Sequence, residues 1–263
     1  MDLDNPAWVY ETYQVPALFG RWARVLIDLA SPAPGAHVLD AACGTGVVAR
    51  MLAPVIGPGG RIVGLDFDPA MIEVARQLAP DLEWRHGDLQ NLPFADESFD
   101  LAICQQGLQF LPDRQAGLQQ IHRVLRPAGR MVLGIWSELA KSPGQARLFE
   151  ALGTILGKDM SSPPAWSLAD AGEVRKLVAS AGFAEIKITK RTLHAPYPSA
   201  RRFVEIMMGG GTSKLTRQAL EQIPAERRAA LIDDVAAHLR EFETAAGCEL
   251  PNESHLVVAY KAG

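Results

Sequence analysis

Three aspartates, Asp40, Asp66 and Asp88, each follow a segment that reads as a short strand in the first third of the chain. A turn with Gly44 and Gly46 comes after the first of them and leads into an apolar run. Glycine lets the backbone turn tightly and approach a ligand closely. A strand, a glycine turn and a helix in succession direct backbone N–H groups toward a small polar ligand. Carboxylates accept hydrogen bonds from hydroxyl and amino groups, so the spacing predicts a site for such a ligand.

The glycine turn alone fits a second class of protein. Residues 44–49 match the dinucleotide pattern G-x-G-x-x-A, and Asp66 lies twenty residues beyond Gly46, as in NAD-binding proteins. An NAD(P)-dependent oxidoreductase would also need a catalytic pair such as Tyr-x-x-x-Lys, or a separate substrate domain. None of the four tyrosines has a lysine four residues later, which counts against such a pair.

Four longer motifs in order favour another family. They read LDAACGTG, GLDFDPAMIEVAR, GDLQNLPFADESFDLAICQQGLQFLPD and RVLRPAGRMVLGIW. Over residues 8–136 the chain resembles the class I S-adenosylmethionine-dependent methyltransferases, and most of all the ubiquinone/menaquinone biosynthesis branch. The resemblance implies S-adenosyl-L-methionine as cofactor and methyl transfer to a small organic acceptor. It also implies that the acceptor attacks the sulfonium methyl in line and that catalysis is mainly by positioning. A catalytically silent module that only binds the cofactor stays open as an alternative.

The resemblance also assigns roles at the cofactor site. Asp66 is expected to accept both ribose hydroxyls, Phe67 to pack on the adenine ring, and Asp88 to accept from the adenine amino group. Asp40 is expected either to orient the glycine turn or to reach the cofactor amino group. The full set of expected cofactor-binding residues is Asp40, Ala41, Gly44, Gly46, Asp66, Phe67, Met71, Asp88, Leu89 and Gln105.

Catalytic residues are not identified by the sequence, because a general base is needed only if the acceptor must lose a proton. His194 and Tyr197 are candidates for a base or an orienting group, since they follow the sixth predicted strand, although the pattern favours plain solvent-facing loop residues. His255 has the same status, whereas His37 opens the first strand at the wrong end. The expected acceptor pocket takes in Tyr13, Gln109, Trp136, Phe203 and Met207, which would also suit plain core positions.

Strands that alternate with helices predict a mostly parallel α/β sheet with helices on both faces. The expected strands contain residues 38–39, 61–66, 82–86, 99–104, 130–136, 184–190 and 253–260. The expected helices cover residues 17–30, 47–52, 69–78, 114–125, 142–156, 168–181, 200–208, 215–221 and 225–246, with residues 1–14 irregular and glycines 209–211 as a break. The resemblance implies a Rossmann-like seven-stranded sheet whose last strand is antiparallel and lies between the fifth and sixth.

This topology predicts two regions. Residues 1–191 and 252–263 form the S-adenosylmethionine-binding domain, which starts with an N-terminal helical segment. Residues 192–251 are inserted between a strand that ends at the ligand edge and one that starts there, so they are expected to form a helical lid over the acceptor.

Composition excludes several classes of function. The 263 residues carry a net charge of −4, which argues against a nucleic-acid or anionic-membrane binder. Three scattered cysteines and six histidines show no metal-ligand spacing. No segment is apolar enough to span a membrane, and the acidic N-terminus is unlike a signal peptide. The sequence thus predicts a cytoplasmic enzyme with no metal that acts on a small molecule, and it leaves a homo-oligomer open.

Overall fold

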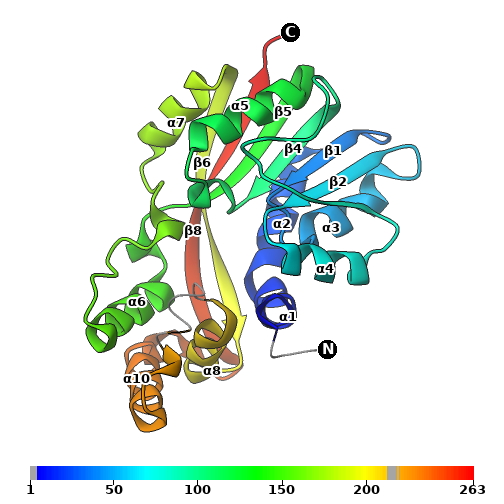
Figure 1. Ribbon diagram of the computed structural model, residues 1–263. Coiled ribbons are helices and arrows are strands. Elements are labelled where there is room, and N and C mark those ends of the chain that lie inside the picture. Colours follow the sequence, from blue (N-terminus) through cyan, green and yellow to red (C-terminus); the bar gives the residue numbers. More distant parts are fainter. Residues whose placement is uncertain (1–4, 212–217, 219) are drawn as a thin grey trace. The chain divides into compact units, whose positions relative to one another are not determined.

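The computed structural model describes residues 5–211, 218 and 220–263 (Figure 1). They form two compact units. The sheet unit comprises Gly20–Ser137, Pro164–Arg191 and Ser254–Gly263, and the helical unit comprises the described residues of Met1–Phe19, Glu138–Pro163 and Thr192–Glu253. The helical unit therefore contains the described part of the predicted insertion together with two further segments of the chain. That the insertion acts as a lid stays a prediction.

The sheet has the strand order β3-β2-β1-β4-β5-β8-β6, with a short β7 paired to β8. The strands are β1 (His37–Ala41), β2 (Arg61–Asp66), β3 (Glu83–His86), β4 (Phe99–Gln105), β5 (Leu125–Trp136), β6 (Phe183–Tyr197), β7 (Glu243–Thr244) and β8 (Gly247–Lys261). Neighbours from β3 to β5 are parallel, and β8 runs antiparallel to β5. The predicted Rossmann-like sheet, with its last strand antiparallel between the fifth and sixth, is confirmed.

Helices cover both faces of the sheet unit (Figure 1). Those of the sheet unit are α2 (Gly20–Ala30), α3 (Val47–Ile56), α4 (Pro69–Leu78), the 3₁₀ turn η2 (Leu108–Phe110), α5 (Arg114–Val124), the 3₁₀ turn η4 (Pro164–Trp166) and α7 (Ala171–Ser180). Alternate strand residues such as Leu39, Val63 and Leu133 pack with α5 and α7 in one apolar cluster. Helix α2 packs against β4 and β5, and helix α3 packs against β2. A sheet buried on both faces explains its nearly continuous apolar strands.

The helical unit is built from shorter pieces. They are α1 (Pro6–Val9), the π-helical η1 (Tyr10–Phe19), η3 (Leu139–Lys141), α6 (Pro143–Leu156), α8 (Ala200–Ile206), η5 (Met207–Gly211), α10 (Ala225–His238) and η6 (Arg240–Phe242). The ring of Tyr197 lies edge-on to that of Phe203 at 5.0 Å in this unit.

Aspartate side chains cap the starts of several helices. Asp68 precedes Pro69, and its side chain accepts a hydrogen bond from the Ala70 N–H. Asp113 and Asp170 cap α5 and α7 in the same manner. Such a cap satisfies a backbone donor that has no partner inside the helix.

Five predictions of local structure are wrong. The N-terminal stretch is helical from Pro6 to Phe19, because Asn5 caps α1 and Pro6 occupies its first position. Strand β6 continues to Tyr197, and β8 begins at Gly247. The last helix ends at His238 and gives way to η6 and β7. Glycines 209–211 continue α8 as a π-helical turn instead of breaking it, and most of the predicted helix 215–221 lies outside the described residues.

The longer strands β6 and β8 have a physical explanation. Pro196 and Pro251 resemble strand breakers in the sequence, yet β6 is the last strand of the sheet order, and an edge strand tolerates proline because one side needs no N–H donor. In β8, Cys248, Leu250 and Asn252 are all buried, so the period-2 pattern of a half-buried strand continues there.

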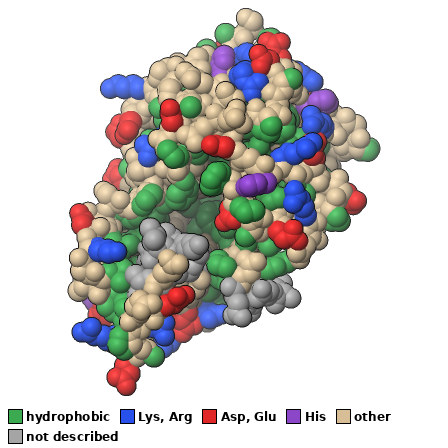
Figure 2. All heavy atoms as spheres, viewed as in Figure 1, with side chains coloured by type: hydrophobic (Ala, Val, Ile, Leu, Met, Phe, Trp, Pro, Cys, Tyr) green, Lys and Arg blue, Asp and Glu red, His purple; other side chains and the backbone are tan. Residues whose placement is uncertain are grey.

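Other predictions about the chain's chemistry can be compared with the described residues. Cys43, Cys104 and Cys248 are buried free thiols, and burial raises the pKa of Cys104 to about 12. The described residues contain neither a helix long and apolar enough to cross a membrane nor a group of three side chains suited to a metal ion. On the face shown in Figure 2, acidic and basic side chains are interspersed.

Candidate functional site

The three predicted aspartates lie at the carboxyl ends of adjacent parallel strands. Asp40 is the fourth residue of β1, Asp66 ends β2, and Asp88 follows β3 by two residues. In the register, Asp40 pairs with Gly64, and Asp66 pairs with His86. Ligands of open parallel sheets bind at this edge. The structure therefore brings together the residues that the sequence singled out.

Asp66 accepts hydrogen bonds from two turns, the glycine turn after β1 and the turn before α4. Its Oδ2 accepts the Gly44 N–H at 2.7 Å, and its Oδ1 accepts the Asp68 N–H at 2.9 Å. Burial raises the pKa of Asp66, and these two N–H groups lower it in part. A carboxylate has about four acceptor positions, so each oxygen retains a lone pair for a ligand hydroxyl. The geometry fits a pair of ribose hydroxyls.

Asp40 is buried beneath the glycine turn, with 1% of its surface exposed. Its Oδ2 accepts the Ala49 N–H in the first turn of α3 at 2.9 Å. Asp40 thus does what an N-cap side chain would do, because the N-cap residue Gly46 has no side chain. Its Oδ1 is buried and has no hydrogen-bond partner among the described residues. Burial raises the pKa of Asp40 to about 7, the Ala49 N–H opposes this rise, and the negative charge of Asp66 adds to it. Asp40 thus orients the helix and keeps one oxygen for a donor.

Asp88 and the residues beside it form the third part of the edge. Its carboxylate accepts the backbone N–H of Gln90 at 2.8 Å and also the Gln90 side-chain amide. Gln90 in turn accepts the Asp113 N–H at 2.9 Å. Leu89 is buried, while Asp88 is half-buried. The loop after β3 is thus held in one conformation with its carboxylate at the sheet edge.

Phe67 is 74% exposed, although phenylalanine normally lies inside a protein. Its carbonyl oxygen is 3.0 Å from Nε2 of His86, and the two rings are 6.4 Å apart. Met71, in the first turn of α4, is half-buried. An exposed ring next to Asp66 suits a flat aromatic ligand group.

Both glycines of the turn adopt left-handed backbone conformations, with φ of +55° at Gly44 and +82° at Gly46. A Cβ on Gly46 would lie 2.1 Å from Cη2 of Trp84. A Cβ on Gly64 would lie 2.4 Å from Cε3 of the same indole. Trp84 is buried and donates from Nε1 to the Ala79 carbonyl at 2.8 Å. The indole, and not only a ligand, therefore requires glycine at both positions, and no pattern in the sequence marks Trp84 as their neighbour.

This packing gives a testable coupling between Gly64 and Trp84. Gly64→Ala should destabilise the protein by about 1–3 kcal/mol, the usual cost of overpacking. In a Trp84→Leu background the same change should cost about 0.5 kcal/mol or less, because the ring is gone and Gly64 has no left-handed backbone to strain. Urea unfolding of the wild type, both single variants and the double variant measures this. Additive losses would contradict the assignment.

Polar side chains also gather where β4 and β5 end. The side-chain Nε2 of Gln106 donates to Oγ of Ser254 at 3.3 Å, and the Gln106 N–H donates to the Gly134 carbonyl. Gln109 is buried, and neither atom of its amide has a partner among the described residues. Trp136 stacks on Trp166 with ring centroids 6.2 Å apart. Gln109 and Trp136 thus lie near the expected edge, and Gln105 is half-buried at the end of β4.

The remaining candidates belong to the helical unit. Phe203 and Met207 are buried, and Tyr13 lies under the guanidinium of Arg202 at 5.0 Å. His194 is exposed and Tyr197 is buried, and both lie inside β6. The expectation that they follow the end of that strand is wrong, because β6 continues through them. Burial also raises the pKa of Tyr197, which makes it a poor base.

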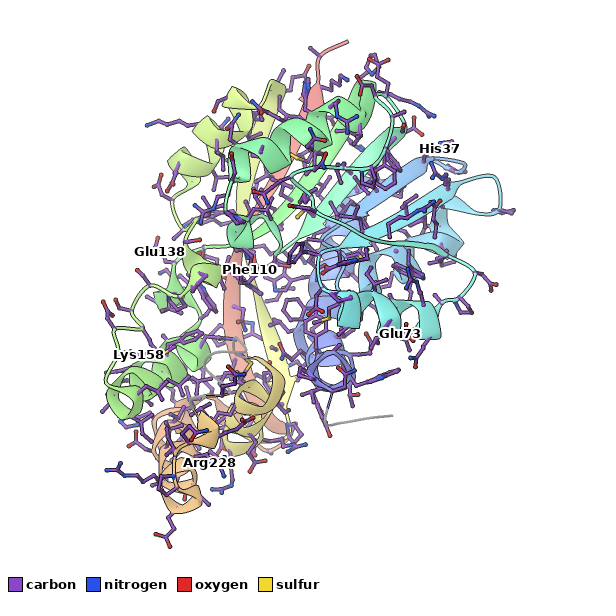
Figure 3. The ribbon with its side chains drawn as sticks, viewed as in Figure 1. His37, Glu73, Phe110, Glu138, Lys158 and Arg228 are labelled. Atoms are coloured by element: carbon purple, nitrogen blue, oxygen red, sulfur yellow. The ribbon has the colours of Figure 1, made fainter. Side chains whose placement is uncertain are left out.

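Two other histidines have structural roles. His37 opens β1, where its N–H donates to Asp100 and its Nδ1 lies 3.3 Å from Arg126. Figure 3 shows His37 and Phe110 at opposite ends of the strands, so His37 is remote from the aspartate edge, as predicted. His255 is fully buried within β8, and its Nε2 donates to the Ala169 carbonyl at 2.7 Å.

Part of the chain is similar to known methyltransferases. Residues 38–129 match the family model described as a methyltransferase domain. A 2-phytyl-1,4-naphtoquinone methyltransferase from Synechococcus elongatus is 37% identical over 139 residues, which are 49% of this chain and 60% of that protein. A demethylmenaquinone methyltransferase from Renibacterium salmoninarum is 33% identical over 150 residues, or 56% and 62% of the two chains. The chain thus spans about 60% of the length of these curated relatives.

Solved structures agree on the fold. The YcgJ protein from Bacillus subtilis superposes with a TM-score of 0.61 at 19% identity, covering 92% of this chain and 98% of that one. A likeness at this identity concerns architecture alone. Together with the matched domain at residues 38–129, the glycine turn and the three strand-end aspartates, it confirms the resemblance to the class I S-adenosylmethionine-dependent methyltransferases found in the sequence.

Proposed function

We propose that the protein transfers a methyl group from S-adenosyl-L-methionine to a small organic acceptor. The observation that carries this proposal is the methyltransferase domain at residues 38–129, whose three aspartates line one edge of the sheet. The residues present fit the cofactor, because Oδ1 of Asp40 is buried without a partner and Phe67 is exposed beside Asp66. The bound cofactor would supply a methyl group already activated on a sulfonium.

The chain's own residues then bind and orient. Asp66 accepts the ribose hydroxyls with its remaining lone pairs, Phe67 covers the adenine, and Asp88 with the Leu89 backbone reads its edge. Asp40 accepts from the amino group, near Gln105 and the glycine turn. Ala41 and Met71 complete the proposed cofactor set. These assignments give an ordered site without a general base, which suits catalysis by positioning.

The acceptor is proposed to be a quinone-type or related small molecule, since both named relatives are naphthoquinone or menaquinone methyltransferases. The described part of residues 192–251 is proposed to set acceptor choice through apolar side chains such as Phe203 and Met207. Tyr13, Gln109 and Trp136 are further proposed pocket residues. His194 stays a candidate orienting residue.

Calorimetry tests the proposed cofactor. S-adenosylhomocysteine should bind to the purified protein, and NADH should give no heat, because the domain match favours a methyltransferase over an oxidoreductase. Transfer of labelled methyl to a demethylated naphthoquinol would then establish the reaction. Binding of NADH with no response to S-adenosylhomocysteine would overturn the proposal, and binding without transfer to any acceptor would leave a silent module.

A further inference from the structure

The first turn of α6 is buried but uncapped. Ser142 occupies the N-cap position with no exposed surface, yet its side chain makes no capping hydrogen bond. Gly144 and Gln145, the second and third helical residues, are also buried. The first N–H groups of a helix have no partner within it. A buried helix start therefore normally has a side chain or a ligand to accept from it.

Besides Gln14, four neutral side chains of the helical unit have buried polar atoms without a partner among the described residues. These atoms are Oγ of Ser142, Oε1 of Gln145, the hydroxyl of Tyr197 and Oδ1 of Asn252. Each side chain is at most 3% exposed. Leaving such a group unpaired costs about 1–3 kcal/mol, and native proteins pair nearly all of them with protein, water or ligand.

Packing contacts connect the immediate neighbours of these groups. A Cβ on Gly144 would lie 2.8 Å from Cδ1 of Leu250 and 3.0 Å from Cε1 of Phe203. The Phe203 ring is 5.0 Å from that of Tyr197, and Asn252 donates from Nδ2 to the Leu250 carbonyl at 2.9 Å. The start of α6 thus packs on the immediate neighbours of Tyr197 and of Asn252. Residues from α6, β6, α8 and β8 meet here.

The chemistry of this cluster selects its ligand. Tyr197 is protonated, because burial raises the pKa of its hydroxyl, so it can donate. The helix start adds N–H donors and the positive end of the helix dipole, which favour an oxygen with negative charge and repel an ammonium group. The amide oxygens of Gln145 and Asn252 can accept from a hydroxyl.

We propose that Ser142, Gln145, Tyr197 and Asn252, with the first turn of α6, bind the oxygen atom of the methyl acceptor. The acceptor is then a phenol-, enol- or carbonyl-type oxygen compound and not an amine. This inference rests on the proposed function, because it takes the ligand to be the methyl acceptor. The site itself is defined by the unpaired atoms and the uncapped helix.

The test uses 4-nitrophenol as a probe and equilibrium dialysis against the full chain. Tyr197→Phe and Ser142→Ala should each weaken binding of the probe roughly tenfold, since each removes one hydrogen bond to an oxygen that carries charge. Their urea unfolding midpoints should be unchanged or higher, because a buried unpaired atom is removed. Benzylammonium should not compete with the probe.

Ser199→Ala is the matched control. Ser199 also stands at an N-cap, but its Oγ accepts the Arg202 N–H at 3.0 Å. This variant should therefore unfold at lower urea and bind the probe as the wild type does. Three results would overturn the proposal: no probe binding by the wild type, equal binding by all four proteins, or a lower unfolding midpoint for Ser142→Ala.

Calorimetry with S-adenosylhomocysteine on the same four proteins separates this inference from the proposed function. Equal cofactor binding, with probe binding lost only in Tyr197→Phe and Ser142→Ala, supports the oxygen site. No cofactor binding by any of them contradicts the proposed function, while the probe results still decide whether the oxygen site exists.

Discussion

Asp66→Ala is expected to weaken binding of S-adenosylhomocysteine by about 1.5–3 kcal/mol, or roughly 10- to 150-fold. The carboxylate would lose two hydrogen bonds to the ribose. It would also lose those that it accepts from Gly44 and Asp68, which hold the glycine turn and the start of α4 in place. The substitution therefore removes the contacts to the ligand and also loosens the two turns that shape the site. Isothermal calorimetry on the folded variant measures the dissociation constant.

Asp100 offers a matched control. It accepts the His37 N–H at 2.8 Å and pairs with Arg126 at 2.6 Å, at the other end of the strands. Asp100→Ala should lower the urea midpoint and leave the dissociation constant within about twofold of the wild type. An unchanged constant in Asp66→Ala would show that Asp66 serves the turns alone.

Asp40→Asn should remove a pH dependence of stability. The unfolded state releases the Asp40 proton near pH 3.8, whereas the native state holds it to about pH 7. Between these values the native state binds more protons, so the free energy of unfolding falls as pH rises through this window. The full loss is on the order of 4 kcal/mol, which is a large fraction of a typical domain's stability.

Urea unfolding at pH 5 and at pH 8 measures this effect. The wild type should lose more stability than Asp40→Asn between the two pH values. Asp66 also has a raised pKa and is present in both proteins, so the difference between them reports Asp40 together with its coupling to Asp66. Asp100 and Glu83 have lowered pKa values, so their effects fall at acidic pH, below this window. Equal losses in both proteins would contradict a protonated buried Asp40.

Much of the sheet unit could be predicted because its signals are local. Strand β2 and helix α4 are found at the predicted residues, since an apolar run, a capping aspartate and a proline at the first helical position all lie within a few residues of one another. The strand order followed from the family resemblance and not from the strands themselves.

The missed features depend on contacts distant in sequence. The sequence around Gly46 and Gly64 does not indicate that one indole, that of Trp84 in β3, packs against both glycines. The helical unit was harder still, because Pro196 and Pro251 resemble strand breaks unless the neighbouring strands are known. The uncapped start of α6 was likewise invisible, since Ser142 before Pro143 matches an ordinary N-cap pattern.

The indole of Trp84 has a consequence for how this sequence can diverge. Positions 46, 64 and 84 share one volume, so a larger residue at either glycine becomes acceptable only after the tryptophan shrinks. Substitution is more restricted at Gly46 than at Gly64, because the backbone φ of +82° at Gly46 disfavours any side chain even without the ring. Substitutions at 64 and 84 should therefore covary among close homologues while position 46 stays fixed. A redesign of the cofactor edge has to treat the three positions as a single unit.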